Sequence, residues 1–177
     1  MKWEQPNWPR FLPSHTVISV ATLGPIGMRL PAPGTWGSFA GLLYFIVCFW
    51  GFGWIGNLLL SAVGAYVAVG FCGEAEFRMG RVDPGEVILD EFVAMPLCFL
   101  GWGHLVSGPV PLWGILIGGF LLFRFFDILK PLGIKKVQHL NAGWGIVVDD
   151  TLAALAACLV MHAGIWIWAA TSHPHAG

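Results

Sequence analysis

The sequence predicts an all-α integral membrane protein, a helical bundle with about five crossing helices and a short N-terminal interfacial or re-entrant helix. Of the 177 residues, 56% are hydrophobic and only 11% are charged, whereas about 25% are charged in an ordinary soluble domain. The mean hydropathy is +0.73. The apolar residues form long runs without period-two alternation, and only helices and closed barrels satisfy backbone polar groups in lipid.

One domain is expected, at residues 15–170, between a polar N-terminal segment at residues 1–14 and a polar tail at residues 171–177. The chain is long enough to bury a core. Residues 1–14 lack the basic, apolar and small-residue pattern of a signal peptide. The net charge of −1 gives no reason to expect nucleic acid as a partner.

Breaks rich in glycine and proline separate the apolar runs. The first run, residues 16–28, is too short to cross a hydrocarbon core that requires about 20 helical residues, so we expect an interfacial or re-entrant helix there. The next two runs follow each other closely and are expected to form a helical hairpin. The five runs expected to cross are residues 38–54, 56–72, 87–105, 112–126 and 146–170.

This order of crossings places the motifs and most basic residues on one side of the membrane. The two later turns on the other side and the tail contain no lysine or arginine. The positive-inside rule therefore makes the first side cytoplasmic. The cations assigned to it are Arg29, Arg78, Arg81, Arg124, Lys130, Lys135 and Lys136.

Acidic residues interrupt the apolar runs at three places, with Asp90 and Glu91 in one, Asp127 in another, and Asp149 and Asp150 in the third. These are half of the ten acidic residues in the chain. A charged side chain within the membrane is costly, so such residues are candidates for a functional site. Because the topology places all three segments at one face, we expect one carboxylate cluster, which suits a hard divalent cation such as Mg²⁺.

Two basic residues accompany Asp127. Arg124, Asp127 and Lys130 are spaced three apart and are expected to share one helix face. One interpretation is an intrahelical ion pair with a lysine that reaches toward the interface. The other is an anion clamp, in which Arg124 and Lys130 hold phosphate oxygens while Asp127 orients them or binds the metal.

Two further segments carry helix-start signals. In PAPGTWGS, residues 31–38, Thr35 or Ser38 is expected to cap the following helix, and N–H groups at its start would suit phosphate. A plain capped turn is the alternative. A helix starting near Glu86 would place Glu86 and Asp90 on one face. Asp83 fits better as the N-cap, with Pro84 at N1 and Glu86 at N3 of a capping box; a role in the site is the alternative for Asp83 and Glu86. For Asp149 and Asp150, the alternative is stabilisation by a helix N-terminus.

Taken together, four segments resemble the phosphatidylglycerophosphatase A family. They are residues 30–38, 83–91, 123–131 and 143–150. The resemblance implies a compact all-α bundle in the bacterial inner membrane, multi-pass, with its active site facing the cytoplasm. It also implies Mg²⁺-dependent removal of the terminal phosphate from phosphatidylglycerophosphate, which gives phosphatidylglycerol. The expected partners are this phospholipid and membrane lipid.

The chain departs from the family pattern at two places. The family usually continues Lys-Pro-Trp-Pro where this chain has Leu132 and Gly133 after the proline, and it often has Ala-Gly where this chain has Ala153 and Ala154. Neither change removes a carboxylate or a basic residue.

The expected site follows from the residues and the resemblance together. The expected catalytic residues are Asp90, Glu91, Asp127, Asp149 and Asp150. The expected Mg²⁺ ligands are Asp90, Glu91, Asp149 and Asp150. The expected phosphate-binding residues are Gly34, Thr35, Ser38, Arg124 and Lys130. A carboxylate could serve as general base or form an aspartyl-phosphate.

Three other classes were considered. A cation transporter would hold its carboxylates near the membrane midplane. A non-catalytic membrane scaffold would tolerate neutral substitutions at Asp90 or Asp150. A CDP-alcohol phosphotransferase would carry a long aspartate signature that this sequence lacks.

Overall fold

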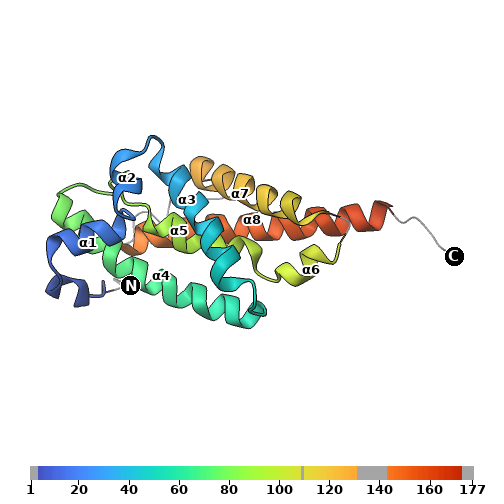
Figure 1. The fold of residues 1–177 in the computed structure, drawn as a ribbon, viewed down its shortest axis with the longest axis horizontal. Helices are drawn as coiled ribbons and strands as arrows, with labels where there is room; N and C mark the ends of the chain where they lie inside the picture. Colours follow the sequence, from blue (N-terminus) through green and yellow to red (C-terminus); the bar gives the residue numbers. More distant parts are fainter. Residues whose placement is uncertain (1–3, 109, 131–142, 173–177) are drawn as a thin grey trace.

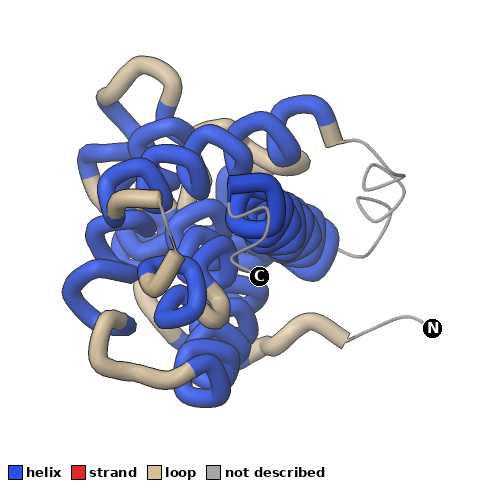
Figure 2. Tube along the Cα trace, turned by 90° about the vertical axis from the view of Figure 1, so that its right-hand side faces the viewer, coloured by secondary structure: helices blue, strands red, loops and turns tan. Residues whose placement is uncertain are grey.

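The computed structural model describes residues 4–108, 110–130 and 143–172, and their regular structure is entirely helical, as predicted (Figure 2). In chain order the elements are η1 (Trp8–Phe11), α1 (Ser14–Ala21), α2 (Pro25–Arg29), α3 (Pro33–Tyr44), η2 (Phe45–Phe49), α4 (Trp54–Met79), α5 (Leu89–Ala94), η3 (Met95–Phe99), α6 (Trp102–Val106), α7 (Leu112–Leu129) and α8 (Gly143–Ser172). The element η2 is a π-helical continuation of α3.

Among the described residues, three helices are long and apolar enough to cross a membrane, so the expected count of about five crossings is not confirmed. They are α4, α7 and residues Gly143–Thr171 of α8. The predicted hairpin corresponds to the shorter apolar helix Pro33–Phe49 followed by α4.

The run at residues 87–105 was expected to be one crossing helix, but it is divided among α5, η3 and α6. Pro96 lacks the backbone donor that a continuous helix needs and lies at the start of η3. Gly101 has a φ of 76° and ends the segment before α6.

The first apolar run forms two short helices instead of one. Leu23 and Gly24 have φ values of 50° and 64°, which no right-handed helix accommodates, so α1 ends before them and α2 begins at Pro25. Neither helix is long enough to cross a bilayer.

The long helices α7 and α8 lie side by side, and α4 runs along the other side of α8 (Figure 1). α5 packs against α3, α4 and α8. The C-terminal end of α4, the end of α7 and the start of α8 lie toward the end that carries α1 and α2, and the end of α8 lies at the other end (Figure 1). Side chains from α5, α7 and α8 can therefore meet at the first end.

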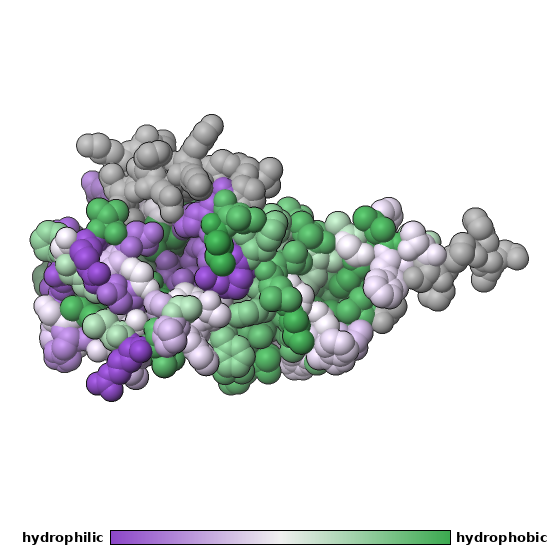
Figure 3. All heavy atoms as spheres, turned by 90° about the horizontal axis from the view of Figure 1, so that it is seen from above, coloured by the Kyte–Doolittle hydropathy of each residue, from purple (hydrophilic) through white to green (hydrophobic). Residues whose placement is uncertain are grey.

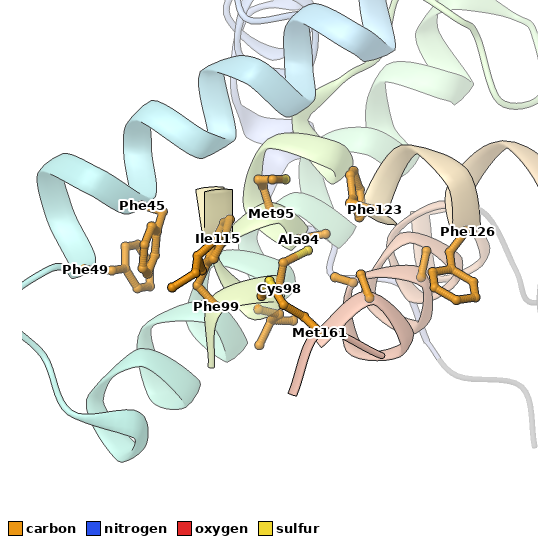
Figure 4. Packing of buried hydrophobic residues seen from close by; sticks show 14 of the residues in the cluster. Phe45, Phe49, Ala94, Met95, Cys98, Phe99, Ile115, Phe123, Phe126 and Met161 are labelled. Atoms are coloured by element: carbon orange, nitrogen blue, oxygen red, sulfur yellow. The ribbon is translucent and has the colours of Figure 1, made fainter. Parts of the chain in front are cut away.

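A buried apolar cluster fixes this arrangement. Phe45 stacks on Phe99 with ring centroids 4.5 Å apart, and Met95, Phe123 and Met161 bring η3, α7 and α8 into the same cluster (Figure 4). A second cluster joins α1, α4, the start of α5 and the start of α8. Close van der Waals packing of these side chains stabilises the association of the helices inside the bundle.

α3 lies unusually close to α5, because glycine faces it. A Cβ atom on Gly41 would lie 2.6 Å from the Phe92 carbonyl oxygen, and one on Gly37 would lie 2.9 Å from Ile88 Cβ. Small residues allow close helix approach in membrane proteins. This contact brings the start of α3 to the start of α5.

The surface divides along the long axis. Figure 3 shows hydrophilic residues gathered at the end that carries α1 and α2, and hydrophobic residues over much of the rest of the face in view. Leu59 on α4, Leu121 on α7 and Leu159 on α8 are each at least 60% exposed. Such exposure on the three long helices fits contact with lipid.

Candidate metal and phosphate site

Three carboxyl groups meet between α5 and α8. Asp90 and Glu91 of α5 and Asp150 of α8 each offer an oxygen, and these atoms lie within 4.8 Å of one another. Asp90 Oδ1, Glu91 Oε2 and Asp150 Oδ2 are buried without a hydrogen-bond partner. Leaving buried acceptors unsatisfied is costly. A divalent cation would satisfy all three, so these residues could hold a metal ion.

The start of α5 positions two of these groups. α5 begins at Leu89, so Asp90 and Glu91 lie in its first turn. Because α5 begins after the expected start at Glu86, the predicted capping box is wrong: the N-cap is Ile88, whose N–H donates to the Ala21 carbonyl oxygen at 3.0 Å.

Asp83 and Glu86 lie outside α5. Asp83 has a φ of 46° within the preceding turn, and Glu86 accepts a hydrogen bond from Arg81 at 2.9 Å. The Arg81 guanidinium lowers the pKa of the exposed Glu86 carboxyl. Neither residue contributes to the three-carboxylate group.

Asp149 and Asp150 have different partners. Asp150 faces the α5 carboxyl groups, whereas Asp149 accepts a hydrogen bond from Lys130 Nζ. Adjacent residues on a helix point about 100° apart, which separates the two charges. Both lie beyond the first turn of the described part of α8. Asp149, expected as a metal ligand, is therefore not one of the three clustered residues.

Arg124 joins three helices. Its Nη1 donates to Asp127 Oδ2 at 2.6 Å and to Ser38 Oγ at 3.3 Å, and lies 3.9 Å from Glu91 Oε1. The intrahelical pair with Asp127 is thus present, together with contacts to α3 and α5. Its side chain is 17% exposed. The site therefore presents a fixed, partly accessible positive charge beside the carboxyl group of Glu91.

Residues at the start of α3 form the side of the site next to Arg124 and Glu91. A Cβ atom on Gly34 would overlap Glu91 Oε1 and lie 3.3 Å from Arg124 Nη1, so a larger residue would require the Glu91 carboxyl group to move. Ser38 Oγ donates to the Gly34 carbonyl oxygen at 2.8 Å while it accepts from Arg124.

The helix that follows the first residues of PAPGTWGS starts earlier than expected. The prediction of a Thr35 or Ser38 cap is wrong, because Ala32, with a φ of 52°, is the N-cap and makes no side-chain cap. The Thr35 N–H donates to the Ala32 carbonyl oxygen at 3.0 Å. Thr35 itself is exposed beside the site residue Gly34.

Lys130 does not lie on the face of α7 that Arg124 and Asp127 share. It caps α7 with a φ of 43° and pairs with Asp149. Burial acts to lower its pKa, but the hydrogen bond and the charge of Asp149 outweigh burial and raise it. Lys130 therefore stays protonated. Lys135 and Lys136, expected on the cytoplasmic side of the membrane, lie outside the described residues.

Glu91 is electrostatically unfavourable as an anion in this cluster. Burial, and then the charge of Asp150, raise its pKa to about 8, against the opposing effect of Arg124. A bound cation would favour the ionised form. Sequence reasoning missed Cys72, a fully buried residue of α4 that lies near Asp90, Glu91 and Asp150. No spacing in the sequence relates Cys72 to the acidic motifs.

The family model described as phosphatidylglycerophosphatase A matches residues 19–165. The chain belongs to the phosphatidylglycerophosphatase A family. The matched region contains all ten residues expected in the site. No solved structure matches the chain.

Curated relatives agree with this family. The chain is 36% identical over 138 residues to a phosphatidylglycerophosphatase A of Haemophilus influenzae, covering 77% of this chain and 81% of the relative. It is 28% identical to the Escherichia coli protein of that name, covering 77% and 76% of the two chains. A putative phosphatidylinositol-3-phosphatase of Bacteroides thetaiotaomicron is 29% identical, covering 88% and 97%.

Proposed function

We propose that this protein is a phosphatidylglycerophosphate phosphatase that hydrolyses the terminal phosphate monoester and releases phosphatidylglycerol. The observation that carries the proposal is the buried group Asp90, Glu91 and Asp150, with one unpartnered oxygen on each residue, beside the Arg124 guanidinium. Metal-binding oxygens next to a fixed cation suit a phosphate dianion. The family and its curated relatives supply the substrate class.

The carboxyl oxygens are hard ligands and fit Mg²⁺, which binds few protein carboxylates and retains room for phosphate oxygens. When bound, the ion would neutralise phosphate charge and lower the pKa of a coordinated water. We assign Asp90, Glu91 and Asp150 to hold it. Asp149 instead positions Lys130, because their charges are paired.

The basic residues Arg124 and Lys130 bind the phosphate group, and they are called the phosphate grip. Asp127 orients Arg124 through the 2.6 Å hydrogen bond, so that the other guanidinium nitrogens can bind phosphate oxygens. Ser38 steadies the same guanidinium. Lys130 and the start of α3 at Gly34 and Thr35 add positive potential. These groups stabilise the charge that develops on the transferred phosphoryl oxygens.

The reaction requires one further carboxylate function. Either a site carboxylate accepts a proton from the attacking water, or a carboxylate oxygen attacks phosphorus and forms an aspartyl-phosphate that water then hydrolyses. Acid quenching during turnover separates the two, because only the second course leaves phosphate bound to protein.

We further propose that the protein lies in the bacterial inner membrane, with this site facing the cytoplasm. The end that carries the site also carries Arg29, Arg78 and Arg81, as the positive-inside rule requires. Trp166 and Trp168, 73% and 57% exposed, lie near the other end and suit the opposite interface.

The test is phosphate release by purified protein in lipid nanodiscs, with phosphatidylglycerophosphate and phosphatidylinositol 3-phosphate compared. We expect release from the first lipid with Mg²⁺, loss of release in EDTA, and recovery when Mg²⁺ is restored. Asp150→Asn should lower the rate by about 10²-fold or more. Glu86→Gln is the matched control and should retain the rate.

Three results would contradict parts of this assignment. Equal phosphate release with and without EDTA would exclude a role for the metal ion in the reaction. Turnover of phosphatidylinositol 3-phosphate alone would change the substrate. No turnover of either lipid, by protein shown to be folded, would reject the phosphatase assignment.

A further inference from the structure

A hollow of about 260 Å³ lies on the surface between α3 and α7, beside the phosphate grip, and is lined by Thr35, Trp36, Phe39 and Phe120. Thr35 follows Gly34 and Phe39 follows Ser38, so both adjoin site residues in sequence. Phe120 precedes Arg124 by one helical turn. The hollow is therefore lined by neighbours in sequence, or one helical turn away, of the site residues that α3 and α7 carry.

Position along α7 places the hollow on the apolar side of the site. Phe120 lies about 6 Å from Arg124 along the helix, away from the charged end of α7. Ile117 and Leu121, 52% and 60% exposed, continue the apolar surface of the helix. The hollow therefore opens beside exposed apolar surface of α7, one helical turn from Arg124.

The walls are preformed aromatic surfaces. Trp36 and Phe39 are in edge-to-face contact at 6.1 Å, and both remain more than 40% exposed. Phe120 is half-buried against the apolar cluster that joins α3, α7 and α8. Exposed aromatic rings held in place are suited to binding an apolar ligand at low conformational cost.

We propose that this hollow binds the glycerol-proximal part of one acyl chain of a diacyl phosphate monoester, and that the lipid enters sideways from the bilayer between α3 and α7. The inference rests on the proposed lipid phosphatase function. A phosphate held at Arg124 leaves the rest of the lipid beside the hollow. The volume is below the about 300–1,000 Å³ of pockets that enclose a drug-sized ligand, so the remaining chain stays in the bilayer.

The first experiment separates chain binding from headgroup binding. Phe39→Ala and Phe120→Ala are assayed with long-chain lipid substrate and with a water-soluble, short-chain lipid of the same headgroup. We expect the KM for the long-chain lipid to rise about tenfold, kcat to stay within about twofold, and the KM for the short-chain lipid to stay unchanged. Phe39→Leu should restore most of the affinity.

Leu121→Ala is the matched control, because this equally apolar residue lies on α7 outside the hollow. It should leave both KM values unchanged. Thermal unfolding is measured for every variant, and Phe120→Leu replaces Phe120→Ala if the latter unfolds. An unchanged KM for long-chain lipid in folded variants, or an equal rise for both lipids, would overturn the proposal.

The second experiment does not depend on turnover. Phosphatidylglycerophosphate and phosphatidylinositol 3-phosphate, each with a diazirine near the acyl carbonyl, are photolysed with the Asp150→Asn protein and with wild type in EDTA. We expect adducts at residues 35–39 and near Phe120, well above those from a phosphatidylcholine carrying the same diazirine.

Equal labelling by phosphatidylcholine would make the occupant an ordinary bilayer lipid and overturn the proposal. Disulfide-linked dimers of a Phe39→Cys variant in a Cys48→Ala background would assign the hollow to a second copy of the chain and also overturn it. Selective labelling by phosphatidylinositol 3-phosphate, with no turnover of phosphatidylglycerophosphate, would reject the proposed substrate but retain the route of entry.

Discussion

At the scale of single residues, Arg124 connects the metal-binding candidates to the phosphate grip. Its Nη1 contacts Asp127, Ser38 and Glu91, which belong to three different helices. A lysine at this position would keep the charge but lose the planar fork that can hold one partner and bind phosphate oxygens at the same time. The role of Arg124 therefore depends on geometry as well as on charge.

Arg124→Lys should lower the rate of phosphate release by about 10-fold or more at saturating lipid and Mg²⁺. Equal membrane expression and thermal unfolding show that the fold is retained. Arg81→Lys is the control, because Arg81 pairs with the partly exposed Glu86 outside the site. Rates that match wild type would limit Arg124 to a structural partner of Asp127.

The three clustered carboxyl groups are expected to destabilise the protein when no cation is bound. Each has an unpartnered buried oxygen, and their charges repel one another. In EDTA, Asp90→Asn or Asp150→Asn should raise the unfolding temperature by roughly 2–4 °C, which corresponds to about 1 kcal/mol. Added Mg²⁺ should stabilise wild type more than either variant.

Differential scanning fluorimetry of the solubilised protein, with and without Mg²⁺, measures both effects. Glu86→Gln provides the control, because Glu86 lies outside the cluster. Destabilisation of both cluster variants in EDTA, with full stabilisation by Mg²⁺, would contradict a three-carboxylate metal site.

At the scale of elements, the contact between α3 and α5 determines whether Gly34 and Ser38 reach Glu91 and Arg124. The contact depends on Gly41, where an added Cβ would lie 2.6 Å from a backbone oxygen of α5 and 2.7 Å from Met95 Cβ. Backbone cannot move aside as a flexible side chain can. A larger residue must therefore separate the two helices.

Gly41→Ala should lower the free energy of unfolding by about 1–3 kcal/mol, the usual cost of overpacking, and reduce activity by moving α3 from the site. Thermal unfolding and phosphate release measure the two effects. Gly118→Ala is the control, because a Cβ on Gly118 of α7 meets no atom within 4 Å. If Gly41→Ala behaves like Gly118→Ala, the close approach does not position α3.

At the scale of the whole molecule, the polar end and the apolar helices indicate how the protein is oriented in the membrane. Val82, 86% exposed, lies in the turn between α4 and α5 at the end with the site, and Ser107, at the end of α6, lies near the other end. If the proposed orientation holds, the first of these positions faces the cytoplasm.

Cysteine labelling tests this orientation in a Cys48→Ala background, because the other three cysteines are buried. A membrane-impermeant maleimide should label Ser107→Cys in intact spheroplasts and Val82→Cys only after lysis. The opposite pattern would place the site outside the cytoplasm.

The sequence by itself determined the helical class, the family and the residue types of the site. Long apolar runs exclude ordinary soluble folds, and four motifs in order are specific to the family. Carboxyl groups within apolar runs indicate a site because burying them is costly without a partner. Periodicity placed Arg124 and Asp127 on one helix face, and the ion pair between them was one of two interpretations of that spacing.

Only the tertiary structure decided which groups pair across helices. Asp150 meets Asp90 and Glu91, while its neighbour Asp149 binds Lys130. The start of α5 at Leu89 depends on the Ile88 hydrogen bond to Ala21 of α1, a residue far away in sequence. Helical period fixes directions only within one helix, whereas these contacts depend on how α1, α3, α5, α7 and α8 pack together.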